Sequence, residues 1–268
     1  MRKQLSHPLK DTASESSNRK YIGNIQWETA LRLNLLLKRE TPSLAEFREA
    51  LYLAWQGSYE SKPVYNCRGN KMAVSDLQQF LSEVTEQREP WRAELLDTRF
   101  EEENNQLVIA YQHRMQSGKL VPQKREILAP CLMQNKTPGI FLEDWLQRAT
   151  QQGFPPADVQ AGEVDYWFPR AGSVAWFGAG SVRVYLICGG GRRGSGAALG
   201  VRSIIRAEGA QKFLEEPEIP KVSESSQEVA SPVVIPENPA DRLVTDLKEL
   251  VPSRLHPELE EIVKRYQK

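Results

Sequence analysis

The chain has 268 residues, of which 40% are hydrophobic and 26% are charged, and its formal net charge is zero. This length suffices for one sizeable domain with appendages, and a neutral chain argues against an electrostatic footprint for nucleic acid or membranes. The three cysteines, Cys67, Cys131 and Cys188, are widely spaced and include no Cys-x-x-Cys pair. They indicate neither a disulfide framework nor a zinc site, and we expect buried thiols.

Residues 1–22 are polar, basic and rich in serine, without periodicity, so we predict a disordered arm. This arm lacks the apolar segment of a signal peptide. No run in the chain approaches the ~18–20 apolar residues that a membrane span needs. We therefore expect a cytoplasmic protein without a membrane span, and association with a virion or a surface stays open.

A helical region is predicted over residues 23–88. Trp27, Leu31 and Leu35 keep a helical spacing, and Ser43 and Glu46 form the ends of a capping box that opens a second helix. A second box, Ser75-Asp76-Leu77-Gln78, predicts the start of a third helix. The expected inward residues of these two helices are Phe47, Ala50, Leu51, Ala54, Trp55, Leu77, Phe80, Leu81 and Val84. A loop or short hairpin is expected over residues 62–71, between the two helices.

From Trp91 onward the period changes to two. Leu107, Ile109 and Tyr111 alternate with polar residues, and Asn104-Asn105 predicts a hairpin turn that joins them to a strand over residues 95–100. Pro138-Gly139 is expected to break the chain. After it, an amphipathic helix is predicted from Phe141, Leu142, Trp145 and Leu146. Helices followed by a hairpin, loops and returning strands favour an α+β fold.

The segment over residues 166–202 is the most informative. Val184, Leu186 and Cys188 alternate with Arg183, Tyr185 and Ile187, so a strand would point one set inward and the other outward. Upstream, Phe177, Ala179 and Ser181 alternate in the same way with Gly178, Gly180 and Val182. The outward set suits neither a solvated face nor a core face, and it indicates a surface that displays arbitrary side chains on a fixed frame.

Four ordered motifs carry a resemblance: Tyr166-Trp167-Phe168-Pro169-Arg170, Ser173-Val174-Ala175-Trp176-Phe177, Leu186-Ile187-Cys188 and Leu199-Gly200-Val201-Arg202. Two upstream segments add to it, Pro90-Trp91-Arg92-Ala93-Glu94-Leu95-Leu96-Asp97 and Lys136-Thr137-Pro138-Gly139-Ile140. Over roughly residues 41–206 the chain resembles the variable target proteins of diversity-generating retroelements. The resemblance implies a C-type-lectin-like domain, related to that of formylglycine-generating enzymes, over residues 89–208, with a variable region at about 166–206.

In that family, error-prone reverse transcription at adenines rewrites the residues between scaffold positions. The resemblance therefore implies a non-enzymatic protein that binds a ligand, expected to be a protein or another macromolecule, with no cofactor, metal or nucleic acid. By position, the candidate binding residues are Trp176, Gly178, Gly180, Val182, Tyr185, Ile187, Gly189, Gly191, Arg193, Gly194, Gly196 and Ala198. Trp176, Tyr185 and Arg193 are the expected anchors, because aromatic and arginine side chains dominate contact energies.

The remaining chain is predicted to be an acidic linker over residues 209–238 and a helical tail over residues 239–268. The tail carries two apolar stripes, made by Leu243, Leu247, Leu250, Val251, Leu255, Leu259, Ile262, Val263 and Tyr266. A helical pair this small buries little area by itself. We expect it to dock on the main domain or on a partner, which includes a second copy of the chain.

Other chemistry fits the sequence less well. The glycine-rich run from Gly189 to Gly196 precedes a strand-like segment, whereas a phosphate-binding loop precedes a helix. Formylglycine-generating chemistry, the enzymatic alternative, needs a copper-binding cysteine pair near the C-terminus, where Cys188 stands alone. No Asp or Glu lies between Trp167 and Ile205, which disfavours calcium-mediated sugar binding. A virion or surface assembly protein is the third alternative.

Single residues also carry expectations. Trp91, Trp145 and Trp167 are expected in the core, whereas Trp176 is as consistent with an exposed or pocket-lining position as with a buried one. His113 is placed at a polar strand end, with nothing to support a catalytic triad. The arginines expected to pair with carboxylates such as Glu94 or Asp97 are Arg92, Arg170 and Arg202.

Overall fold

The computed structural model describes residues 26–36, 39–66, 70–87, 89, 91–191 and 199–201. Within these residues the chain forms four helices and eight strands, so the predicted α+β class is confirmed. The elements are α1 (Trp27–Leu36), α2 (Leu44–Tyr59), α3 (Val74–Thr85), β1 (Arg92–Glu103), β2 (Gln106–Gln116), β3 (Lys119–Ile127), β4 (Lys136–Ile140), α4 (Leu142–Arg148), β5 (Val164–Trp167), β6 (Ser173–Ala179), β7 (Val184–Gly191) and β8 (Leu199–Val201). The predicted arm, linker and tail lie outside the described residues.

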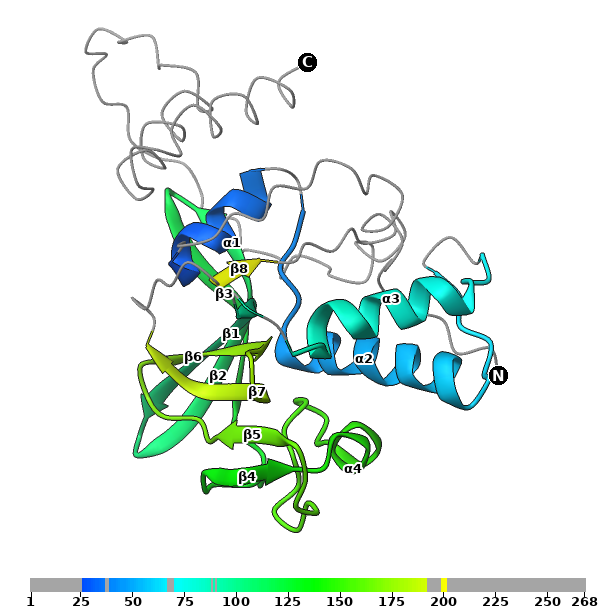
Figure 1. The fold of residues 1–268 in the computed structure, drawn as a ribbon. Helices are drawn as coiled ribbons and strands as arrows, with labels where there is room; N and C mark the ends of the chain where they lie inside the picture. Colours follow the sequence, from blue (N-terminus) through cyan, green and yellow to red (C-terminus); the bar gives the residue numbers. More distant parts are fainter. Residues whose placement is uncertain are drawn as a thin grey trace, which may run out of the picture. The chain divides into compact units, whose positions relative to one another are not determined.

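The strands form one mixed sheet in the order β3-β2-β1-β6-β7-β5-β4, and β8 pairs with β1 off this path (Figure 1). The long strands β1, β2, β3, β6 and β7 pair antiparallel, whereas β5 runs parallel to β7. The middle of this order is therefore β1, β6 and β7, which come from the two halves of the domain. Strand β6 lies between β1 and β7, so both of its edges are hydrogen-bonded.

Helices α2, α3 and α4 bury their apolar stripes against the sheet and one another. Phe177 of β6 is the residue where these layers meet. Its ring centroid lies 5.3 Å from that of Phe47 in α2 and 5.9 Å from that of Trp145 in α4. All three side chains are at most 1% exposed. Trp145 also donates its indole N–H to the carbonyl of Gly153 at 2.9 Å, which satisfies the buried polar atom.

Helix α1 packs near β1 and β2 through a second buried cluster. Trp27 donates its indole N–H to the carbonyl of Leu96 at 2.7 Å and meets the ring of His113 edge-on at 5.1 Å. The carboxylate of Asp97 accepts from the backbone N–H of His113 at 2.8 Å and contacts the imidazole Nδ1. His113 is 2% exposed, so its expected position at a polar strand end was wrong.

Two local predictions are confirmed in detail. Ser43 caps α2, and both halves of its capping box with Glu46 are present. Asn104 and Asn105 form the β1–β2 turn with φ of 51° and 60°, the left-handed pair that a two-residue hairpin requires.

Two others were wrong. Helix α3 begins at Val74, and its N-cap Ala73 makes no side-chain cap bond, so Ser75 lies inside the helix. Pro138 and Gly139 continue β4 instead of breaking the chain. The strand passes so close to β5 there that a Cβ at residue 139 would lie 1.8 Å from the backbone oxygen of Val164. No described helix has the length and apolar character that a membrane crossing demands.

We predict that Phe177→Asp and Leu186→Asp each unfold the domain. Both side chains are fully buried, and a carboxylate there has no partner, so a loss above about 4 kcal/mol in the free energy of unfolding is expected. Gly191→Asp is the matched control, because no atom lies within 4 Å of a Cβ built there. Urea and thermal melts measure the three variants, and a native-like melt of Leu186→Asp would show that the inward face is assigned wrongly.

Candidate ligand-binding site

The two faces of β7 differ sharply in their surroundings, and in β6 Trp176 is the one residue that is not buried. Phe177, Leu186 and Cys188 are fully buried and belong to the core, as the alternation predicts. The intervening residues Tyr185 and Ile187 are only half-buried, and the burial of β7 alternates along most of its length. The opposite face of these strands is therefore the one that a ligand can reach.

Strand register brings aromatic side chains together on this face. Trp176 of β6 lies opposite Ile187 of β7, and Ile187 lies beside Trp167 of β5. One step along, Gly178 lies opposite Tyr185. Neighbours in adjacent strands on one face are close enough for their side chains to touch, so three strands contribute to one row.

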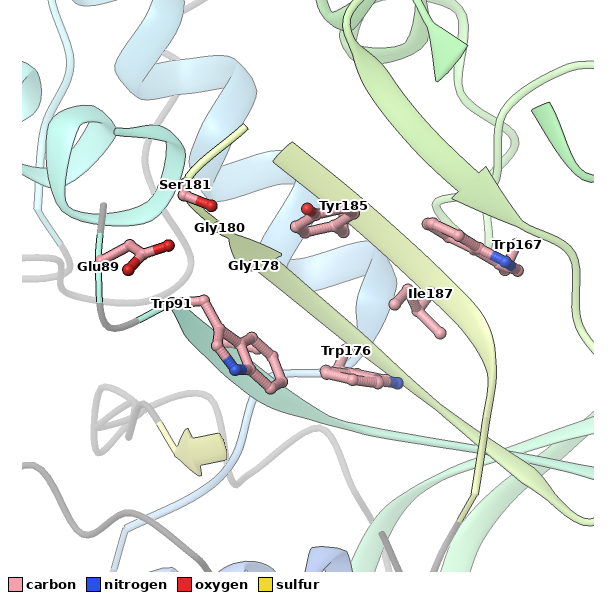
Figure 2. Close-up of a pocket in the computed structure, with 10 residues that line it drawn as sticks. Glu89, Trp91, Trp167, Trp176, Gly178, Gly180, Ser181, Tyr185 and Ile187 are labelled. Atoms are coloured by element: carbon pink, nitrogen blue, oxygen red, sulfur yellow. The ribbon is translucent and has the colours of Figure 1, made fainter. Parts of the chain in front are cut away.

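These residues line a pocket with a volume of about 540 Å³ (Figure 2). Its lining residues are Glu89, Trp91, Ala93, Trp167, Trp176, Gly178, Gly180, Ser181, Tyr185 and Ile187. A volume in this range suits a small molecule or a few side chains of a larger partner. The lining is mostly aromatic and aliphatic, with few polar groups.

Two aromatic pairs stand on the two sides of the pocket (Figure 2). The ring centroids of Trp91 and Trp176 are 5.6 Å apart with planes inclined at 47°. Those of Trp167 and Tyr185 are 6.0 Å apart and inclined at 46°. Tilted pairs at these distances are favourable, so the two rings of each pair stabilise each other's position without a ligand.

Of the predicted binding residues, the structure brings Trp176, Gly178, Gly180, Tyr185 and Ile187 to the pocket. Three others are exposed and are not among its lining residues: Val182 (68% exposed), Gly189 and Gly191. The rest, Arg193, Gly194, Gly196 and Ala198, lie outside the described residues. That these positions bind a ligand stays a prediction.

Sequence reasoning missed half of the lining. Glu89 gave no signal. The alternation placed Ser181 on the inward side with Phe177, which was wrong, because Ser181 is exposed and lines the pocket. Trp91 and Trp167 were expected in the core, which was also wrong. Trp91 is 38% exposed and its ring packs on that of Trp176. It therefore lies at the pocket and not in the core. The expectation for Trp145 is confirmed, since it is fully buried.

The arginine expectations met mixed outcomes. Arg92 contacts Glu94 at 2.9 Å, as predicted. Asp97 is instead bonded to His113. Arg170 places its guanidinium 4.8 Å from the centre of the Phe168 ring, and Arg202 lies outside the described residues.

The glycines of β6, β7 and the turn between these strands differ in the space around them. A Cβ at residue 178 would lie 2.5 Å from the backbone oxygen of Arg92, and one at residue 190 would lie 2.0 Å from the indole nitrogen of Trp176. A Cβ at residue 180 would meet only the outer part of the Tyr185 ring, at 2.9 Å, and its three nearest atoms include no backbone atom. Side chains are therefore hardest to accommodate at residues 178 and 190.

The buried thiols have little nucleophilic character. Burial raises the pKa of Cys131 to about 11 and that of Cys188 well above its usual value, so both are protonated near neutral pH. Cys67 lies outside the described residues. In the part of the chain with described coordinates, no group of three or more His, Cys, Asp or Glu residues is placed to hold a metal ion.

No protein-family model matches the chain, and no curated protein or solved structure shows significant similarity to it.

We predict that Gly178→Ala destabilises the fold by about 1–3 kcal/mol, the usual result of overpacking. The added methyl group would also lie 2.6 Å from the Ala93 Cβ, so β1 and β6 must separate. Gly191→Ala is the control and should change the free energy of unfolding by no more than about 0.5 kcal/mol. Urea denaturation measures both, and equal stabilities would mean that the floor of the pocket is free to vary.

Proposed function

We propose that this chain is a non-enzymatic ligand-binding protein with a C-type-lectin-like fold, whose binding face is diversified by a retroelement through mutagenic reverse transcription of its gene. One observation carries the proposal. Residues at the intervening positions of the family motifs, such as Trp176, Tyr185 and Ile187, line one pocket, whereas Phe177 and Leu186 between them are buried. The placement of these five residues supports the proposal.

The chemistry of the lining supports binding without turnover. Trp and Tyr side chains offer large contact areas with few rotatable bonds, which makes them effective anchors. Glu89 and Tyr185 are the ionisable side chains among the described lining residues. No His, Lys or Cys accompanies them there, so this part of the site offers no imidazole, amine or thiol for general-base or nucleophilic catalysis.

Diversification also requires that pocket residues change without unfolding the domain. Tyr185 is half-buried and its ring packs on Trp167, outside the hydrophobic core. Its neighbour Leu186 is in that core. Substitutions of these adjacent residues are therefore expected to differ in their effect on stability, because neighbours in a strand lie on opposite faces.

We predict that Tyr185→Ser and Gly180→Asn leave the fold intact. Loss of the half-exposed Tyr185 ring should lower the free energy of unfolding by at most about 1 kcal/mol, since partial burial contributes only part of an aromatic transfer energy. Thermal melts beside Leu186→Asp provide the comparison. If Tyr185→Ser is as destabilising as Leu186→Asp, the pocket face is structural and the proposed function loses its site.

We further predict a genetic signature at the locus. A near-copy of the sequence that encodes residues 166–206 should lie beside a reverse-transcriptase gene, with adenines at the mismatched sites. Sequencing the locus from sister cells should find substitutions in the codons for Trp176, Tyr185 and Ile187 and none in those for Phe177 and Leu186. Absence of the near-copy, or substitutions spread equally over both sets, would refute diversification.

A further inference from the structure

The pocket carries negative charge. Glu89 is its one charged residue among the lining side chains that the structure describes, and it is exposed at the rim. Two described arginines are close in sequence to lining residues, and both pair with other carboxylates. Arg92 contacts Glu94 at 2.9 Å, and Arg183 contacts Asp165 at 2.8 Å. Their charges are therefore compensated, and among the described residues the charged group at the rim of the pocket is the carboxylate of Glu89.

The aromatic walls reinforce this preference. The face of an indole or phenol ring carries negative electrostatic potential and attracts a cation within about 6 Å of its centre. Three of the rings are indoles, which bind cations best. Figure 2 shows Trp91 and Glu89 at one end of the pocket, with Trp176 and Ile187 farther along. A cation between the walls would thus lie near several aromatic rings and a carboxylate.

The shape of the pocket favours an ammonium group over a guanidinium. A planar guanidinium stacks on an aromatic face, but within each wall the two rings are inclined at 46° or 47°, so neither wall offers it one flat surface. An ammonium group has no plane and needs no parallel walls. Ala93 and Ile187 add aliphatic surface along which the methylene groups of a lysine can lie.

We propose that the pocket binds a lysine side chain of a partner protein, with the methylene groups against Ile187 and the ammonium group between the indole rings and Glu89. The volume of about 540 Å³ holds the side chain together with adjoining backbone. A carboxylate or phosphate ligand would meet Glu89 without a basic partner among the described lining residues. A sugar would find few polar partners there, with Ser181 and the Tyr185 hydroxyl as the neutral hydroxyl groups.

This inference rests on the proposed function only in taking the pocket as the binding site, and its test is independent of the locus. The full-length protein is titrated with Nα-acetyl-lysine N-methylamide and with Nα-acetyl-norleucine N-methylamide, and the indole N–H resonances are followed by NMR. The two probes share their backbone and most of their alkyl chain and differ in the ammonium group. We expect the lysine probe to bind about 2- to 30-fold more tightly, the range of cation–π energies.

Two matched variants locate the effect. Glu89→Gln should weaken binding of the lysine probe severalfold and leave the norleucine probe unchanged, because only the charge is removed. Glu102→Gln, an exposed acid of β1 that does not line the pocket, should change neither affinity. Both positions are exposed, so folding is expected to be preserved, and a thermal melt checks it.

Norleucine binding as tight as lysine binding, or a Glu89→Gln variant with unchanged lysine affinity, would overturn the inference. Tighter binding of the blocked arginine analogue than of the lysine probe would overturn the choice of lysine. None of these outcomes bears on whether sister cells differ in the codons of the pocket, so the failure of the ligand assignment and the failure of diversification are distinguishable.

Discussion

The packing of Phe177 between Phe47 and Trp145 is the constraint on which the rest of the domain depends. It joins α2 and α4 to β6, and it fixes which face of that strand is inward. Because successive side chains of a strand point to opposite faces, burying Phe177 sends Trp176 and Gly178 to the other side. Strand β7 pairs with β6, so Leu186 lies on the buried face beside Phe177, and Tyr185 lies on the opposite face beside Gly178.

A face with four partly exposed aromatic residues is a liability that this fold limits by pairing the rings. Trp91 packs on Trp176, and Trp167 on Tyr185, so each ring is partly covered by another. Apolar patches of this kind on protein surfaces usually mark binding sites. The pairing also links chain segments far apart in sequence: Trp91, just before β1, and Trp176 of β6 form one wall, and Trp167 of β5 and Tyr185 of β7 form the other.

Local sequence signals predicted the elements whose causes are local. The Ser43 capping box and the Asn104-Asn105 turn act within a few residues, and the alternation around Leu186 needs only one buried face. Strand β3 escaped prediction because its residues are polar and mostly exposed, so no burial pattern marks it. Its pairing with β2 comes from the Ser117-Gly118 turn and from backbone hydrogen bonds.

The candidate site was predicted in part for the same reason. Alternation on β7 identified Tyr185 and Ile187, and the family resemblance added Trp176, whereas Trp91 and Glu89 reach the pocket through tertiary placement just before β1. An apolar residue in a periodic segment is consistent with a core position or with a pocket wall, and sequence alone does not separate them. The misplacement of Trp91 and Trp167 follows from that ambiguity.

The glycines of β6 and β7 have unequal room for a side chain. Gly178 is held by the close approach of β1, and Gly190 by the ring of Trp176, while the surroundings of Gly191 are open. If side chains on this face are rewritten, the walls at Trp176, Tyr185 and Ile187 can change shape and chemistry over a floor that must stay small. Binding specificity would then vary through the walls, and the depth of the pocket would be a property of the scaffold.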